Sequence, residues 1–149
     1  MAELRKLDET AVKECAEIYI GAYGEAPWNE KYRMEDVEKY IRAFLDSDAK
    51  CAYVLAEGEH ILGVALGVVI PCIGSCYFRL EDICIDPEYQ GMGYGRELLG
   101  FMEDALGETG CDSILLGTQR GYPSHRFYME NGFREIESVL LFREIERVE

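Results

Sequence analysis

The sequence predicts an α/β domain built from about seven strands and about four helices. Three observations carry this prediction. An apolar, strand-like run leads through a glycine-rich turn into a helix at residues 81–99. Apolar spacings typical of strands and of helices follow one another along the rest of the chain. The length of 149 residues suits one domain with a substantial core, so we expect a single domain over residues 1–149.

Local signals place the elements and their ends. Asp8 or Thr10 can cap the first helix, and Gly24 ends it. Gly58 lies in the turn of a predicted hairpin, and Pro123 suits the first position of a short helix. The expected order is strand 4–7, a helix ending at residue 24, helix 34–46, strands 51–57, 61–70 and 76–85, a helix after the glycine turn, strand 113–118, a short helix, and strands 133–136 and 139–145.

The stretch that organises the chain is EDICIDPEYQGMGYGRELL, residues 81–99. Its apolar run at 83–85 is typical of a buried strand, and residues 86–88 interrupt that strand. A glycine-rich turn at 90–96 then opens directly into an amphipathic helix. The N–H groups and dipole of a helix start attract an anion, and glycines let a phosphate approach the backbone. The stretch therefore predicts a phosphate-binding loop.

The glycine spacing separates this loop from two common nucleotide-binding motifs. Arg96 occupies the third glycine position of G-x-G-x-x-G, and no Gly-Lys-Ser/Thr follows for a Walker A loop. The pattern that fits is Q/R-x-x-G-x-G/A, at Gln90, Gly93 and Gly95. This pattern resembles the acetyl-CoA pyrophosphate loop of the GNAT superfamily of N-acetyltransferases. The resemblance implies that the donor is bound by Gln90, Gly91, Met92, Gly93, Tyr94, Gly95 and Arg96.

A second segment and the element order resemble the same family. Residues 127–133, FYMENGF, are similar to the family's Y-x-x-x-G-F segment, which implies that Tyr128 lies beside the acetyl-CoA sulfur. Family members often have Asn seven residues before that tyrosine, where this chain has Gly121. Gln119, Arg120 or Ser124 would then replace that contact with the pantetheine arm. The element order resembles the GNAT fold over essentially the whole chain, which implies a mixed central sheet of about seven strands flanked by about four helices.

Acetyl transfer to an amine needs a base, because an amine with a pKa of about 10 is mostly protonated at neutral pH. The resemblance puts a carboxylate at the end of the strand before the loop, where Glu81 stands, and a regular strand would point Asp82 to the opposite face. Backbone N–H groups of this strand would bind the pantetheine arm and polarise the thioester carbonyl. The residues concerned are Ile83, Cys84 and Ile85.

Tyr128 offers a phenolic proton to the leaving thiolate. No acyl-enzyme is required, so a ternary complex with direct transfer is expected. Two plainer interpretations stay open. In the first, Glu81 is only an acid at the splayed edge of a sheet. In the second, Tyr128 only packs under the donor.

Acidic and aromatic residues outside the predicted core indicate a cationic amine as the acceptor. They are Trp28, Glu30, Tyr32 and Asp82. The run from Pro27 to Glu30 also resembles the aminoglycoside 6′-N-acetyltransferase branch of the family. Polyamines, free amino acids and peptide amines satisfy the same charge argument.

Composition limits the other partners. The net charge of −14 argues against nucleic acid and anionic membranes, and favours either a cationic partner or simply a soluble surface. The chain has no apolar run of about 18 residues, and its start, MAELRKLDET, lacks the apolar core of a signal peptide. Six cysteines without C-x-x-C spacing indicate reduced thiols and a cytoplasmic protein.

We therefore expect acetyl-CoA as the acyl donor, no metal, and a homodimer by family resemblance. Two alternatives of another class remain. One is a non-catalytic acetyl-CoA-binding sensor, and the other is a different phosphate-binding α/β protein.

Overall fold

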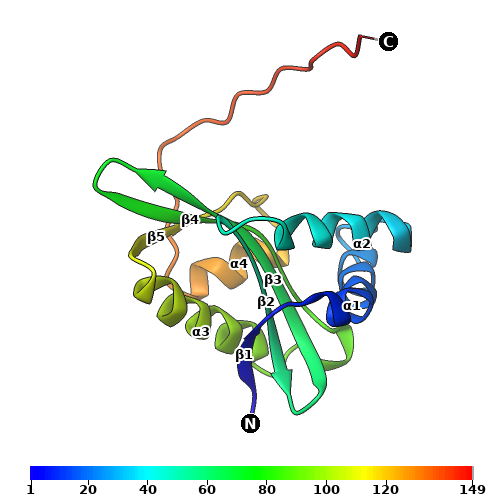
Figure 1. The fold of residues 1–149 in the computed structure, drawn as a ribbon. Coiled ribbons are helices and arrows are strands. Elements are labelled where there is room, and N and C mark those ends of the chain that lie inside the picture. The colour runs from blue at the N-terminus through cyan, green and yellow to red at the C-terminus, as the bar shows by residue number, and fades with distance from the viewer. Residues whose placement is uncertain (149) are drawn as a thin grey trace. The chain divides into compact units, whose positions relative to one another are not determined.

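The computed structural model describes residues 1–148 and contains two compact units, Met1–Gly117 and a second that begins at Thr118 (Figure 1). The first unit contains β1 (Glu3–Lys6), η1 (Glu9–Ala11), α1 (Val12–Gly24), α2 (Met34–Arg42), η2 (Ala43–Leu45), β2 (Lys50–Glu57), β3 (His60–Cys72), β4 (Ser75–Ile85), η3 (Pro87–Tyr89), α3 (Tyr94–Glu108) and β5 (Cys111–Leu115). The second unit contains α4 (Pro123–Glu130). The single domain expected over residues 1–149 remains a prediction. No helix within residues 1–148 is both long enough and apolar enough to cross a membrane.

The first unit is built on a five-stranded mixed sheet in the order β1-β2-β3-β4-β5. The first three neighbouring pairs are antiparallel, and β4 and β5 are parallel. Gly58 supplies the left-handed backbone, with a φ of 63°, in the tight turn between β2 and β3. A parallel neighbour requires a crossover connection, which α3 provides between β4 and β5. The expected mixed sheet is confirmed.

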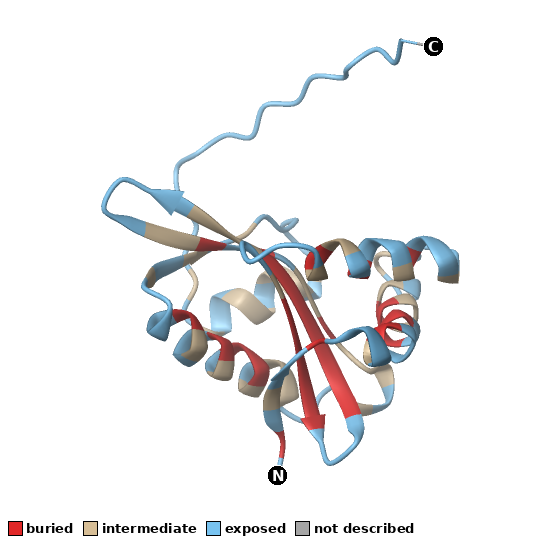
Figure 2. Cartoon of the chain, in the orientation of Figure 1, coloured by how far each residue is buried: buried red, intermediate tan, exposed pale blue. Residues whose placement is uncertain are grey.

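Helix α1 covers one face of this sheet, and α2 packs against α1 (Figure 1). Their buried side chains, such as Val12 and Ile41, form one apolar cluster with Val64 and Leu66 of β3. Alternate residues of a strand point to the same face, which is why Val64, Leu66 and Val68 of β3 all contribute to this cluster. Figure 2 shows the resulting band of buried residues along the central strands.

Helix α3 packs against the opposite face through buried residues that include Leu98 and Met102. Two glycines of β3 allow close packing on this side. A Cβ at Gly63 would meet the Leu98 side chain at 3.5 Å, and a Cβ at Gly67 would lie only 2.1 Å from the Phe78 ring. Gly67 therefore has to lack a side chain, because the Phe78 ring of β4 occupies the space that a Cβ would fill.

Strand β4 contains a β-bulge. Leu66 of β3 pairs with Asp82, and the next β3 residue, Gly67, pairs with Leu80, so Glu81 is the extra residue. A bulge interrupts the alternation of strand side chains. The regular strand assumed from the sequence, which would point Glu81 and Asp82 to opposite faces, is therefore absent here.

The second unit begins its helix at Pro123 as predicted, but the chain after this helix is irregular. The strands expected at 133–136 and 139–145 are not formed within residues 118–148, so the predicted number of strands was wrong. The apolar residues Val139 to Phe142 are at least 80% exposed (Figure 2). A strand forms only where a neighbour takes up its backbone hydrogen bonds, and the sequence shows strand propensity without showing the partner.

Candidate active site

The glycine-rich turn joins the end of β4 to the start of α3. Gly91 and Gly93 have φ values of 78° and 87°, in the left-handed region that other residues rarely adopt. Gly93 is the N-cap of α3 and brings no side chain to the first helical N–H groups. A Cβ built on either glycine meets no atom within 4 Å. The turn thus leaves open space in front of helix N–H groups, which fits a pyrophosphate.

The other predicted loop residues surround this turn. The Gln90 side chain donates from Nε2 to the Ile85 carbonyl at 3.0 Å, which ties the turn to the end of β4. Tyr94 and Gly95 form the first turn of α3. None of the six residues from Gly91 to Arg96 is buried. The predicted donor-loop residues therefore gather at one accessible helix start.

The outer edge of β4 beside this turn has no strand partner within residues 1–148. The last pair between β4 and β5 is Arg79 with Leu115, whereas β4 continues to Ile85. The end of β4 thus presents backbone groups to the side away from β3. A free strand edge of this kind can bind an extended ligand through main-chain hydrogen bonds.

The direction of these backbone groups follows from one hydrogen bond. The N–H of Asp86 donates to Leu62 on β3 at 2.8 Å. Because antiparallel strands alternate their bonding direction, Cys84 also faces β3, and Ile83 and Ile85 direct their N–H groups outward. Of the three predicted strand contacts, Ile83 and Ile85 fit the pantetheine role, and Cys84 contributes a buried side chain to the core.

A carboxylate surrounded by three tyrosines lies beside the bulge of β4. Asp82 accepts hydrogen bonds at Oδ1 from the hydroxyls of Tyr19 and Tyr23, each at 3.1 Å, and at Oδ2 from the hydroxyl of Tyr40 at 2.5 Å. Tyr19 and Tyr23 are one turn apart on α1, and Tyr40 comes from α2. We call these four residues the tyrosine cluster.

Burial and hydrogen bonding act on the tyrosine cluster in opposite directions. Burial raises the pKa of the Asp82 carboxyl, and the hydrogen bonds from the tyrosines lower it without cancelling that effect. Burial, followed by the Asp82 charge, raises the pKa of Tyr19, Tyr23 and Tyr40. The tyrosine hydroxyls therefore stay protonated near neutral pH and keep donating to the carboxylate.

The loop between α1 and α2 extends this cluster with more aromatic surface. The ring of Trp28 packs edge-on against Tyr23 with centroids 5.6 Å apart, and Tyr32 lies 5.8 Å from Tyr19. The backbone N–H of Glu30 donates to the Tyr23 carbonyl at 2.9 Å, and after burial the Glu30 charge raises the pKa of Tyr32. The structure thus brings the predicted acceptor residues together at the tyrosine cluster.

Glu81, the predicted base, lies next to the cluster in a more exposed position. Its Oε1 accepts a hydrogen bond from Nε of Arg79 at 2.5 Å, and the two side chains are 36% and 49% exposed. Besides burial, the Glu81 charge raises the pKa of both Asp82 and Tyr40. Because exposed ion pairs contribute only about 0–1 kcal/mol, Glu81 can readily exchange Arg79 for water or an amine.

In the second unit, Ser124 and Tyr128 both belong to α4. The Tyr128 ring packs against Phe127 and Phe133, with centroids 5.3 Å apart in both cases. The Ser124 hydroxyl lies 2.8 Å from the Thr118 hydroxyl. The roles of Ser124 and Tyr128 toward the donor remain predictions.

The position where the family often has Asn is a glycine with a left-handed backbone, since Gly121 has a φ of 87°. Of the three residues proposed to replace it, Arg120 is held by Glu135 through two hydrogen bonds of 3.2 and 3.0 Å. Ser124 is likewise paired, with Thr118, so the choice among Gln119, Arg120 and Ser124 remains a prediction.

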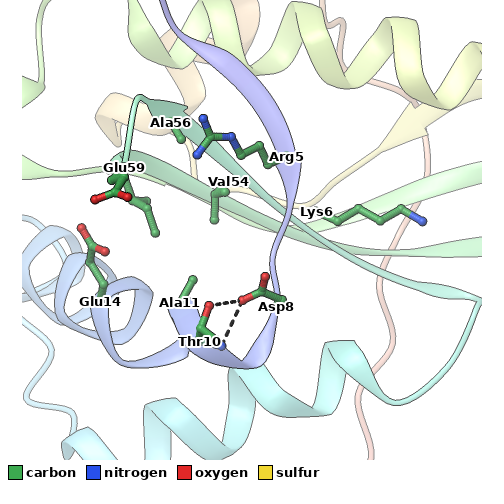
Figure 3. Close-up of a pocket in the computed structure, with 10 residues that line it drawn as sticks. Arg5, Lys6, Asp8, Thr10, Ala11, Glu14, Val54, Ala56 and Glu59 are labelled. Atoms are coloured by element: carbon green, nitrogen blue, oxygen red, sulfur yellow. Dashed lines mark hydrogen bonds between the residues drawn. The ribbon is translucent and has the colours of Figure 1, made fainter.

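A separate hollow of about 210 Å³ lies where β1 meets the start of α1 (Figure 3). Its ten lining residues include none of the tyrosine cluster. Asp8 in this hollow already accepts hydrogen bonds from the backbone and hydroxyl of Thr10, at 3.0 and 2.5 Å, and so acts as a cap. Within residues 1–148, no three His, Cys, Asp or Glu side chains are arranged to hold a metal ion.

Tyr19, Tyr23 and Tyr40 were not identified as site residues from the sequence, because helical spacing places them beside apolar residues on helix faces. One signal was available. A buried tyrosine carries a hydroxyl that needs a hydrogen-bond partner, whereas phenylalanine or leucine would fill a core position without this requirement. Tyr19 is buried, Tyr23 is partly buried and Tyr40 is 37% exposed, and all three hydroxyls share Asp82 as their acceptor.

Residues 12–133 match the family model described as the acetyltransferase (GNAT) family. The match spans most of the chain and includes β4, the glycine turn and α4. The chain therefore belongs to the GNAT acetyltransferases, whose acyl donor is acetyl-CoA.

Solved structures show the same fold at low sequence identity. A possible acetyltransferase from Clostridium difficile 630 has a TM-score of 0.86 at 12% identity, covering 99% of both chains. An aminoglycoside antibiotic 6′-N-acetyltransferase, AAC(6′)-IG, from Acinetobacter haemolyticus has a TM-score of 0.78 at 14% identity, covering 97% of this chain and 99% of that one. A transcriptional regulator from Bacillus halodurans C-125 has a TM-score of 0.79 at 19% identity, covering 97% and 100%.

Proposed function

We propose that this acetyltransferase moves an acetyl group from acetyl-CoA directly to a primary amine on a cationic small molecule, in a ternary complex. The observation that carries the proposal is the tyrosine cluster. It presents a partly buried carboxylate in an aromatic surround, next to the bulge carboxylate of Glu81. An ammonium group binds favourably to such a combination of anion and aromatic rings.

The donor side rests on the glycine turn and the free edge of β4. The N–H groups at the start of α3 receive the pyrophosphate, and Gly91 and Gly93 leave room for it. The outward N–H groups of Ile83 and Ile85 hold the pantetheine arm and polarise the thioester carbonyl. Acetyl-CoA supplies the activated acyl group when it is bound.

The acceptor side rests on the hydrogen-bonding capacity of Asp82. A carboxylate has about four acceptor positions, and the tyrosine hydroxyls fill three of them. One position is left for an N–H of the ammonium group. Trp28 and Tyr32 add aromatic faces to the same region, and a second positive group on the acceptor would find the exposed acid Glu30.

Glu81 takes the proton that the amine must lose before its nitrogen attacks. Asp82 is less accessible for this step, because three tyrosine hydroxyls already donate to its two oxygens. Glu81 stands one residue away on the bulge and reaches solvent, so it can accept the proton directly or through water. Tyr128 then returns a proton to the leaving thiolate.

The test is the release of CoA thiol from acetyl-CoA across a panel of aminoglycosides, polyamines, free amino acids and short peptides. Protein without acceptor corrects for the six cysteines of the chain. We expect turnover with polycationic amines and little with neutral or acidic ones. Glu81→Gln should reduce kcat most at low pH, where unprotonated amine is scarcest. An unchanged pH profile in this variant would move the base role away from Glu81.

A non-catalytic acetyl-CoA-binding module is the second candidate. The observation in its favour is that the Glu81 carboxylate is paired with Arg79. Binding of acetyl-CoA in calorimetry, combined with no thiol release for any amine in the panel, would support this alternative. Turnover that disappears in Glu81→Gln would exclude it.

A further inference from the structure

Two thiols face each other across the parallel pair of strands at the sheet edge. Cys76 of β4 and Cys111 of β5 are direct partners in the strand register, and their Sγ atoms are 3.3 Å apart. Both are free cysteines and both are partly exposed. The donor site and the tyrosine cluster use neither of them.

The backbone geometry suits a covalent link between these thiols. Neighbouring strands lie about 4.8 Å apart, within the range of roughly 4.4–6.8 Å between Cα atoms that disulfides span. The sulfurs need to approach by about 1.2 Å to reach bonding distance. Within residues 1–148, strand β5 is an edge strand that pairs with β4 alone, and Cys111 is its first residue, so a small shift there disturbs few strand pairs.

We propose that Cys76 and Cys111 are a modification site that forms a reversible intramolecular disulfide when the protein meets a peroxide. This goes beyond acetyl transfer and does not depend on the acceptor. Of the other four cysteines, Cys15 and Cys84 are buried, Cys72 is exposed at the end of β3, and Cys51 is partly exposed on β2. Cys51 is near enough to Cys111 to interact with it electrostatically, but Cys76 is the thiol in contact with Cys111.

The chemistry balances with hydrogen peroxide as the oxidant. The Cys111 thiolate attacks one peroxide oxygen, the O–O bond breaks, and the second oxygen leaves as water after taking up the thiol proton. The Cys76 sulfur then attacks the sulfenic acid, an S–S bond replaces the S–O bond, and a second water leaves. Two thiols and one peroxide thus give one disulfide and two waters, and a dithiol reductant reverses the reaction.

The order of these steps follows from the contact between the sulfurs. The hydrogen bond with Cys111 raises the pKa of Cys76, so Cys76 remains a thiol at neutral pH and acts second. A neighbouring thiol already in contact resolves the sulfenic acid before further oxidation. The pair therefore favours a disulfide over the irreversible sulfinic acid.

The link would close a loop between residues 35 positions apart. That loop contains the end of β4, the glycine turn and all of α3. Closing it reduces the conformational freedom of the unfolded chain, so the oxidised protein should be the more stable form.

The experiment treats the reduced full chain with hydrogen peroxide and then follows intact mass, non-reducing peptide maps and thermal unfolding. We expect the loss of two hydrogen atoms, a cross-linked peptide pair containing Cys76 and Cys111, and a rise in the thermal midpoint of roughly 5–15 °C. Dithiothreitol should reverse all three changes. Cys76→Ser should abolish the cross-link, and the matched control Cys72→Ser should leave it intact.

Three outcomes would overturn the proposal. The first is a disulfide that joins other cysteines or two copies of the chain. The second is oxygen addition at Cys76 or Cys111 without a cross-link. The third is an unmodified wild-type chain under conditions that oxidise a small-molecule thiol completely.

Discussion

Removing the charge of Asp82 while keeping its shape is the most direct test of the acceptor site. In Asp82→Asn the amide oxygen still accepts from tyrosine hydroxyls, but the group no longer attracts an ammonium. A hydrogen bond to a charged group contributes about 1.5–3 kcal/mol, which corresponds to a factor of roughly 10 to 150. We therefore expect kcat/KM for the acceptor to fall by roughly 10- to 150-fold, mainly through KM, with the acetyl-CoA KM unchanged.

The assay for this variant is steady-state thiol release with acceptor and donor varied separately. Asp104→Asn, an exposed change on α3, is the matched control for the loss of one negative charge and should leave both constants unchanged. Equal losses in Asp82→Asn and Asp104→Asn would mean that overall charge, and not the tyrosine cluster, attracts the acceptor. An unchanged acceptor KM in Asp82→Asn would refute the site.

Thermal unfolding separates this effect from misfolding. The folded-state pKa of Asp82 is raised, so its contribution to stability is complete below the unfolded pKa and disappears as the pH rises through the folded pKa. At pH 8 the Asp82 carboxyl of wild type is ionised in its partly buried position and no longer makes this stabilising contribution. The thermal midpoint of Asp82→Asn should therefore equal or exceed that of wild type at pH 8. It should fall below that of wild type only at acidic pH.

Three further predictions concern the cluster, the donor turn and the sheet. Tyr40→Phe removes a hydrogen bond that lowers the pKa of the Asp82 carboxyl, so the acidic limb of the pH profile of acceptor kcat/KM should move to higher pH. An unchanged acidic limb would contradict Asp82 as the carboxylate that binds the acceptor. Gly93→Val, at a φ of 87°, should abolish acetyl-CoA binding in calorimetry, whereas Gly74→Val, with a φ of 81° in a distant turn, should carry similar strain and bind normally. Gly67→Ala places a Cβ 2.1 Å from the Phe78 ring and should lower the free energy of unfolding in urea by roughly 1–3 kcal/mol. The control Gly100→Ala meets no atom within 4 Å and should be neutral or stabilising. Equal stabilities of the two variants would contradict the packing at Gly67.

The sequence by itself determined the order of the elements up to the helix at Pro123, and it predicted the donor loop. Strand, glycine turn and helix are local features, since each depends on residues a few positions apart. Gln90, Gly93 and Gly95 therefore identified the loop before any long-range contact was known. The helix that starts at Pro123 was equally predictable, because proline suits the first helical position.

The proposed acceptor site depended on tertiary structure. Tyr19 and Tyr40 lie 63 and 42 residues from Asp82 along the chain, and only the packing of α1 and α2 on the sheet brings their hydroxyls to one carboxylate. The bulge at Glu81 was also invisible, because it arises from the register of β4 against β3 and not from local sequence. The apolar segment 139–145 has strand propensity, but it has no strand partner within residues 1–148 and forms no strand there. Local patterns therefore predicted the phosphate loop, and long-range packing determined which side chains surround Asp82, the proposed site for the amine.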